Sequence, residues 1–249
     1  MWIVRADEPP GASVVKAIRG GDVQALKRLL GEHPRLVTAS IVGAGEKCRV
    51  DGTLRTLLHV ATDWPGHFPN AAATVMALID AGADVNARFT GPHPETPLHW
   101  AASSDDVEVL DALLDAGADI EAPGAVIGGG TPLADAVTFG QWRVAGRLVE
   151  RGARTTLWQA AALGLADRVD QHFADAACPA PGDVNKAFWF ACHGGQRRSG
   201  EYLLARGADM NWIPPWEKLT PLDTARRSHT DHFVVWLRGL GAKSAEELG

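Results

Sequence analysis

A Thr-Pro-Leu triplet that recurs in phase with Gly-Ala pairs constrains this chain more than any other feature of its sequence. The triplet begins at Thr96, Thr131 and Thr220. Threonine before proline is typical of a helix start, because the hydroxyl caps a free N–H group and proline at the first helical position loses no hydrogen bond. Gly-Ala pairs, which suit helix ends, follow the apolar helical stretches and begin at Gly82, Gly117, Gly152 and Gly207. The pattern therefore predicts a repeated helical unit.

The alanine that follows each opening motif identifies seven copies of this unit. These alanines are Ala17, Ala61, Ala101, Ala136, Ala160, Ala191 and Ala225, and they are spaced by 44, 40, 35, 24, 31 and 34 residues. The best copy is the Thr-Pro-Leu-His-Trp-Ala sequence that starts at Thr96. Its motif and a period near thirty-three residues resemble the ankyrin repeat. The resemblance covers about residues 13–240 and is weakest in the first and fifth copies.

The resemblance implies an all-α fold, an ankyrin-repeat solenoid of stacked helix-turn-helix units with short β-hairpin or loop fingers. We therefore predict a single domain over residues 1–249, with units near 13–54, 55–94, 95–130, 131–154, 155–186, 187–219 and 220–249. In the family a histidine of the opening motif, here His59 or His99, joins backbone groups of neighbouring units. Units four, five and seven carry Ala134, Trp158 and Asp223 at that place.

Several segments depart from the repeat. Residues 37–53 are glycine-rich and predict a long connection, and residues 63–70 predict a looped insertion with two prolines. The short spacing before Ala160 predicts that a finger is missing between Arg154 and Thr155. In the first unit, Ser13 is the expected helix cap.

The composition limits the class of partner. The formal net charge is −6, and no long run of Lys or Arg is present, which argues against a nucleic-acid partner and suits a basic protein. Cys48, Cys178 and Cys192 form no C-x-x-C pair, so neither a disulfide framework nor a zinc site is indicated. The chain shows no signal peptide and no run of eighteen apolar residues, so we expect a cytoplasmic protein without a membrane segment. We also expect a monomer.

The resemblance also implies where a partner would bind. In the family the concave face is lined by residues two and three positions after the motif alanine and by the finger tips. Tryptophan and arginine dominate binding hot spots, so the aromatic members of this set are its sharpest feature. For Trp64, Trp212 and Trp216, which lie in Pro-rich loops, binding and local loop packing remain equal alternatives. The predicted contact residues are Trp64, His93, Glu95, Ser103, Ser104, Thr138, Phe139, His193, Trp212, Trp216, Lys218 and Arg227.

No pattern of residues predicts a catalytic, metal or cofactor site. Cys192 and His193 are adjacent, and neighbours on a helix do not bring their side chains together. The glycines at 128–130 lack the Lys-Ser/Thr pair of a phosphate-binding loop, and His67, His93 and His99 lack metal-ligand spacing.

The sequence therefore favours a non-catalytic protein–protein interaction module, of which an inhibitor or immunity-type protein is a special case. The alternative is an enzyme or small-molecule binder with an aromatic pocket in the concave groove, lined by Trp158 and Trp189.

Overall fold

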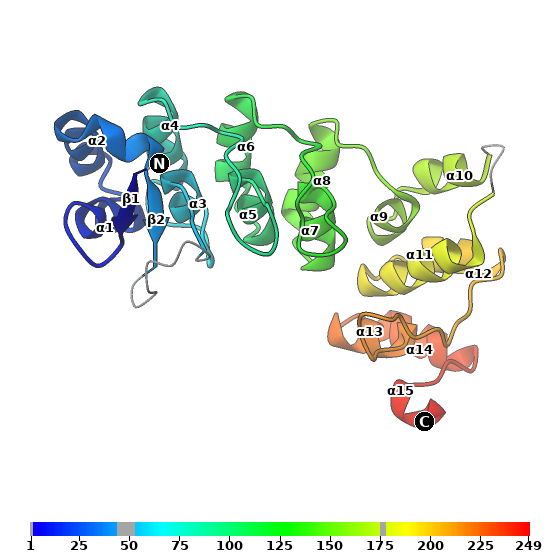
Figure 1. The fold of residues 1–249 in the computed structure, drawn as a ribbon. Coiled ribbons are helices and arrows are strands. Elements are labelled where there is room, and N and C mark those ends of the chain that lie inside the picture. Colours follow the sequence, from blue (N-terminus) through cyan, green and yellow to red (C-terminus); the bar gives the residue numbers. More distant parts are fainter. Residues whose placement is uncertain (1, 44–52, 175–177) are drawn as a thin grey trace. The chain divides into compact units, whose positions relative to one another are not determined.

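The computed structural model describes residues 2–43, 53–174 and 178–249, which form two compact units, Met1–Ala153 and Arg154–Gly249 (Figure 1). The predicted seven helix pairs are confirmed, and the fold is predominantly α-helical. The division between the units falls where the sequence predicts a missing finger. The single domain expected over 1–249 stays a prediction, and Cys48 lies outside the described residues.

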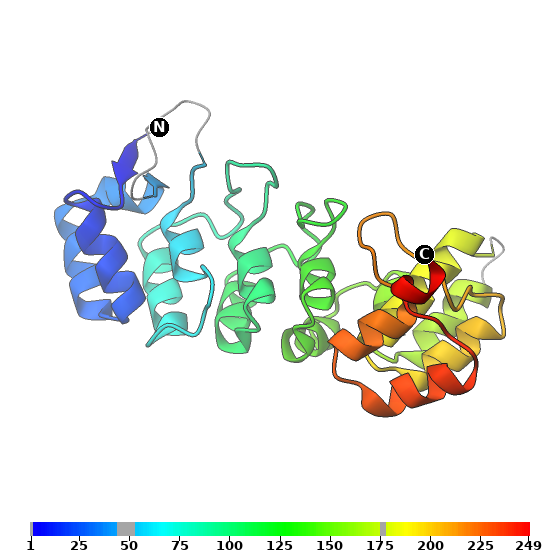
Figure 2. The same cartoon turned by 90° about the horizontal axis from the view of Figure 1, so that it is seen from below.

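The described residues of the first unit form four helix pairs stacked in chain order (Figures 1 and 2). The first helices pack as one row and the second helices as another. Small side chains such as Ala101 and Ala136 are fully buried between the first helices. The elements are β1 (Ile3–Arg5), α1 (Gly11–Gly20), α2 (Val23–Glu32), the 3-10 helix η1 (Pro34–Thr38), β2 (Ser40–Val42), α3 (Leu57–Ala61), α4 (Ala71–Asp80), α5 (Pro97–Ser103), α6 (Val107–Asp115), α7 (Pro132–Thr138) and α8 (Trp142–Glu150).

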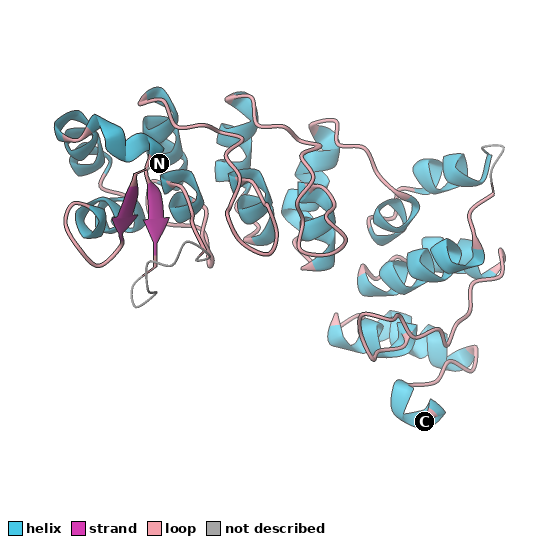
Figure 3. Ribbon diagram, viewed as in Figure 1, coloured by secondary structure: helices cyan, strands magenta, loops and turns pink. Residues whose placement is uncertain are grey.

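The described strands lie near the N-terminus, and the sequence did not predict them (Figure 3). β1 and β2 pair in parallel, with Ile3 opposite Ser40. Antiparallel bridges then join Ile41 to Arg55 and Leu54 to Thr90, which links the finger backbones of successive pairs. Residues 37–53 were expected to form only a connection, but this segment contributes β2 and the end of η1. Ile41 of β2 is buried in the core.

The second unit contains three helix pairs and a terminal helix. The first helices α9, α11 and α13 pack in sequence around a core that includes Phe188, Leu203 and Phe233. The terminal helix is held by a hydrogen bond from Ala245 N–H to the Asp223 carboxylate, 2.7 Å. The elements are α9 (Leu157–Ala162), α10 (Ala166–Ala174), α11 (Pro181–His193), α12 (Arg197–Leu204), α13 (Pro221–Arg227), α14 (Asp231–Gly239) and α15 (Ala245–Leu248).

The helix starts follow the sequence signals closely where threonine precedes proline. α5, α7 and α13 begin at Pro97, Pro132 and Pro221, each with threonine as the N-cap residue. The expectation for Ser13 was wrong, because α1 begins at Gly11, after Pro10, without a side-chain cap.

Candidate functional site

The third residue of α3 and of α5 joins its repeat to the next one. These residues are His59 and His99, and both side chains are fully buried. His59 Nε2 lies 3.2 Å from the carbonyl oxygen of Glu95, and His99 Nε2 lies 3.3 Å from that of Gly130. Glu95 and Gly130 each precede the N-cap threonine of the following pair. The predicted structural role of both histidines is confirmed.

The hydrogen-bond partners fix the protonation of these histidines. Nδ1 of His99 accepts the backbone N–H of Thr96 at 3.1 Å, so the ring proton is on Nε2, which donates to the carbonyl. Burial disfavours the charged imidazolium and lowers the pKa of His59 and of His99 to about 4. Both histidines are therefore neutral structural residues at pH 7.

In the second unit other residues occupy this joint. Trp189 donates from Nε1 to the carbonyl oxygen of Leu219 at 2.9 Å, and Leu219 precedes the N-cap Thr220. Its indole thus makes the inter-repeat bond that histidine makes in the first unit. In α9 the side-chain oxygen of Gln159 accepts the N–H of Thr156 at 2.8 Å. The assignment of Trp158 to this position was wrong, because the N-cap of α9 is Thr156 and the third residue of the helix is therefore Gln159.

The structure divides the predicted contact residues between the two units. Trp64, 78% exposed, and Phe139, 47% exposed, are the open aromatic side chains of the first-unit set. His93, Ser103 and Thr138 are half-buried there. The remaining two, Glu95 and Ser104, are buried. In the second unit Trp216, Lys218 and Arg227 are exposed, Trp212 is half-buried and His193 is buried.

Ser104 is covered by the insertion at residues 63–70. Gly66, at a φ of 74°, approaches Ser104 so closely that an added Cβ would lie 2.7 Å from its Cβ. His67 N–H also donates to the Asp106 carboxylate at 2.8 Å, and the same carboxylate caps α6 through Val109 N–H at 3.2 Å. The insertion therefore fastens the second pair to the third, and Trp64 projects from it.

Glu95 is not an exposed finger-tip residue, contrary to its predicted position. Its carboxylate accepts a hydrogen bond from Trp100 Nε1 at 3.2 Å and interacts with the buried carboxyl of Asp135. Burial and the neighbouring charge of Glu95 raise the pKa of Asp135 to about 8. The Glu95 and Asp135 carboxyls lie inside the first unit, so both residues belong to its core and not to a contact surface.

An aromatic surface in the second unit brings together five side chains from α9, α11 and the connection before α13. Trp216 lies 6.3 Å from Trp189 and 5.7 Å from Trp212 between ring centroids. Phe190 lies 4.3 Å from Trp158 and 6.5 Å from Trp216. We use the name aromatic surface for Trp158, Trp189, Phe190, Trp212 and Trp216.

Cationic side chains lie over these rings. Lys186 Nζ is 4.6 Å from the ring centroid of Trp158 and 5.6 Å from that of Trp216. The Arg227 guanidinium carbon is 5.7 Å from the Trp189 centroid, and Arg227 also pairs with Glu217. His193 lies 6.0 Å from Trp189 and its Nδ1 is 2.9 Å from the Ser228 hydroxyl. The structure thus gathers four of the predicted contact residues, namely His193, Trp212, Trp216 and Arg227.

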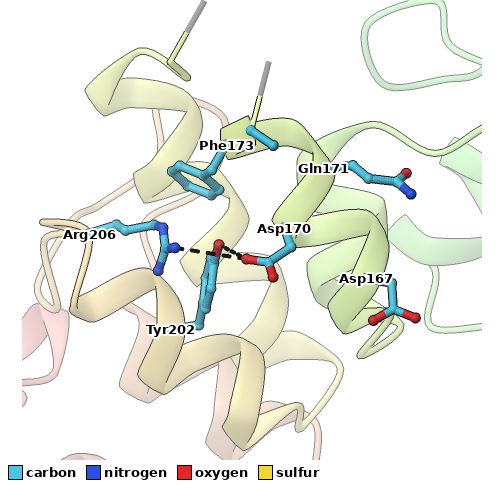
Figure 4. Close-up of a pocket in the computed structure, with 7 residues that line it drawn as sticks. Asp167, Asp170, Gln171, Phe173, Tyr202 and Arg206 are labelled. Atoms are coloured by element: carbon cyan, nitrogen blue, oxygen red, sulfur yellow. Dashed lines mark hydrogen bonds and ion pairs between the residues drawn. The ribbon is translucent and has the colours of Figure 1, made fainter. Parts of the chain in front are cut away.

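Among the described residues of the second unit, two cavities bear on ligand binding. The larger, of about 560 Å³, lies beside Trp158 and Lys186. Trp189, the other residue expected to line a pocket with Trp158, is not among its lining residues and is 2% exposed. The smaller, of about 440 Å³, lies between α10 and α12 (Figure 4). Its polar groups already engage one another: Tyr202 donates to Asp170, and Arg206 lies 3.3 Å from the Tyr202 ring centroid.

The described residues contain no group of three or more His, Cys, Asp or Glu side chains that could hold a metal ion. Burial raises the pKa of the Cys192 thiol well above its usual range, which opposes formation of a nucleophilic thiolate. Over the same residues, none of the helices is both long and apolar enough to span a bilayer.

The sequence reasoning missed Phe190 as a member of the aromatic surface and Lys186 as the cation above it. Lys186 lies three residues before Trp189 on α11. Counting helical positions from the proline at the start of α11 would have identified it. The helix begins at Pro181, whereas the sequence interpretation began the unit only at residue 187. Gln159 was missed because the fifth unit was aligned on Ala160, although the Thr156-x-x-Gln159 spacing of a capping box marks the start of α9 one residue later.

Comparisons with known proteins point to one family. A family model for ankyrin repeats, in three copies, matches residues 68–158. The crystal structure of the human ASB11 ankyrin repeat domain is similar, with 20% sequence identity, a TM-score of 0.51 and coverage of 92% of this chain and 98% of that chain. At this identity the likeness concerns the fold alone. The search of curated proteins gave no match.

Proposed function

Since this chain is an ankyrin repeat protein, we propose that it binds a partner protein through the aromatic surface of its second unit and through exposed side chains of its first. Ankyrin repeats are a generic protein–protein interaction module. The observation that carries the proposal is the cluster of Trp212 and Trp216 beside Trp189, with Trp216 42% exposed.

The energetics of binding favour such a cluster. Large aromatic side chains provide much contact area and dominate hot spots. Trp216 already packs on Trp212, Trp189 and Phe190. Ordering this ring on binding therefore costs little rotamer entropy, and more of the contact energy appears as affinity.

The charge distribution suggests what the partner carries. Residues 1–153 contain 13 Lys and Arg against 19 Asp and Glu, whereas residues 154–249 contain 11 of each. The whole net charge of −6 therefore lies in the first unit, and a basic region of the partner would be attracted there. An inhibitor or immunity-type protein acting on a basic target fits this description as a special case. The cytoplasmic location and the monomeric state also stay proposals.

The proposal is tested by removing the exposed aromatic rings. The full-length double variant Trp212→Ala, Trp216→Ala and the wild type are used as baits, and each captured protein is identified by mass spectrometry and titrated against both. We expect a loss of affinity of at least about 30-fold, as for hot-spot residues worth about 2 kcal/mol.

The matched control is Val235→Ala, which truncates a 73% exposed apolar residue on α14, outside the aromatic surface. It should bind like the wild type, and circular dichroism should show the same helix content for all three proteins. A partner that binds the double variant as tightly as the wild type would contradict the proposed role of the aromatic surface.

A further inference from the structure

The larger cavity of the second unit has the dimensions of a small-molecule site. Its volume of about 560 Å³ lies within the range of about 300–1,000 Å³ found for ligand pockets. The wall is apolar at Leu157, Trp158 and Pro179 and polar at Thr155, Thr156, His172, Asp183 and Lys186. A small ligand would find both an apolar wall and a few oriented polar groups there.

Lys186 is the residue of this cavity whose ammonium group would bind a ligand. Its ammonium lies over the rings of Trp158 and Trp216, and it makes no hydrogen bond or ion pair with the described part of the chain. Lys186 is half-buried, and this burial lowers the pKa of its ammonium. An ammonium has three N–H donors, and a ring face accepts none of them as well as an anionic oxygen does. A carboxylate at the cavity mouth would therefore gain a charge-assisted hydrogen bond.

The other ionisable groups limit the charge of that ligand. Asp183 lies on the same helix and lines the cavity without forming an ion pair with Lys186 in the described structure. A second negative charge on the ligand would face the Asp183 carboxylate and be repelled. His172 donates from Nε2 to the carbonyl oxygen of Thr155 at 3.2 Å, which leaves Nδ1 as an acceptor. Arg168 approaches the Thr155 hydroxyl at 3.5 Å and is not part of the cavity wall.

We propose that this cavity binds a small monocarboxylate with a compact apolar body, the carboxylate on Lys186 Nζ and the apolar part against Trp158. The site shares Trp158 with the aromatic surface and does not depend on the proposed protein partner. In this site Lys186 would recognise the single negative charge of the ligand. Its ammonium makes no hydrogen bond or ion pair in the described chain.

The test is a calorimetric titration of the full-length protein with phenylacetate and two close analogues. Phenylacetamide has nearly the same shape without the charge, and phenylmalonate adds a second carboxylate. We expect phenylacetate to bind with a dissociation constant of about 1 mM or lower, and each analogue to bind at least about tenfold more weakly. Tryptophan fluorescence should change with phenylacetate because Trp158 forms the wall.

Two lysine variants separate the site from general charge effects. Lys186→Met keeps the length of the side chain and removes the charge, so we expect at least about a tenfold loss of affinity for phenylacetate. Lys243→Met, at an exposed lysine of the same unit, should leave affinity unchanged. Lys186→Arg keeps the charge and should retain affinity within about threefold, which guards against a mere folding defect.

Three results would overturn the proposal. They are equal binding of phenylacetate and phenylacetamide, full affinity in a folded Lys186→Met variant, and no phenylacetate binding up to about 10 mM. Binding of a capped Phe-Asp-Phe peptide without binding of phenylacetate would likewise reject a small-molecule site and assign Lys186 to a protein partner.

Discussion

The carboxyl of Asp135 is a single buried group whose protonation the fold controls. Asp135 is fully buried, and Oδ1 accepts the backbone N–H of Val126 at 3.1 Å. In the described structure Oδ2 is buried without a hydrogen-bond partner, and the carboxyl of Glu95 lies close enough to influence that of Asp135. Two carboxyls in such a place share one proton, because two neighbouring negative charges without water are costly. The sequence could not reveal this, since it placed Glu95 at an exposed finger tip.

The raised pKa of Asp135 predicts that the first unit loses stability as pH rises. The pKa is about 8 in the folded state against 3.8 for the ordinary group, so the folded state binds the extra proton between these values. The free energy of unfolding then falls as pH increases toward 8 and the proton is lost. Between pH 6 and pH 9 the loss should be about 2–3 kcal/mol, at 1.36 kcal/mol per pKa unit.

Urea denaturation at pH 6 and pH 9 measures this loss, and Asp135→Asn should remove most of it. Glu108→Gln, at an exposed acid of the same unit, is the control and should keep the wild-type pH dependence. If Asp135→Asn loses as much stability as the wild type over this interval, the shared proton is not at Asp135.

The helix starts show how far local sequence determines an element. Three Thr-Pro-Leu triplets predicted the first residues of α5, α7 and α13, because a cap and a proline act within one helical turn. α11 carried the weaker signal of Pro181 with Asp183 in its first turn, and its start was missed. β1 and β2 were missed because strand pairing joins residues about 37 apart in the chain. The aromatic surface was predicted only in part, since the packing of α11 against α9 brings Phe190 into it and Lys186 over it.

The hydrogen bond from the Trp189 indole joins α11 to the next repeat, and its contribution to the free energy of unfolding can be measured. Trp189→Phe keeps an aromatic ring but leaves the carbonyl oxygen of Leu219 without its 2.9 Å donor. A buried acceptor without a partner costs about 1–3 kcal/mol, so we expect the free energy of unfolding to fall by that amount. Chemical denaturation followed by circular dichroism measures the change.

Trp236→Phe is the matched control for this joint. Trp236 packs on Phe233 with ring centroids 4.9 Å apart, and its indole N–H makes no hydrogen bond in the described residues. Its substitution should therefore cost less than that of Trp189. Equal losses in the two variants would mean that ring packing, rather than the bond to Leu219, accounts for the effect.

At the scale of the whole molecule, the chain divides into two compact units at Ala153, next to the predicted missing finger. In repeat proteins each unit is stabilised by its own packing and by its interfaces with its neighbours. The histidine joints occur in the first unit, whereas Trp189 and Gln159 occupy the corresponding positions in the second. The repeat motif predicted the number of pairs but not this division, because a compact unit is defined by packing between elements and not by any one motif.

This division predicts that a substitution which destabilises one unit will not destabilise the other. Leu110 on α6 and Leu203 on α12 are both fully buried, so replacing either with alanine should cost about 2–5 kcal/mol. Hydrogen exchange measured by mass spectrometry should then show faster exchange within residues 2–153 for Leu110→Ala and within residues 154–249 for Leu203→Ala. The two variants are each other's controls, because the chemical change is the same. Faster exchange across both units in either variant would instead show one cooperative domain over the whole chain, since local stability is then shared by all the repeats.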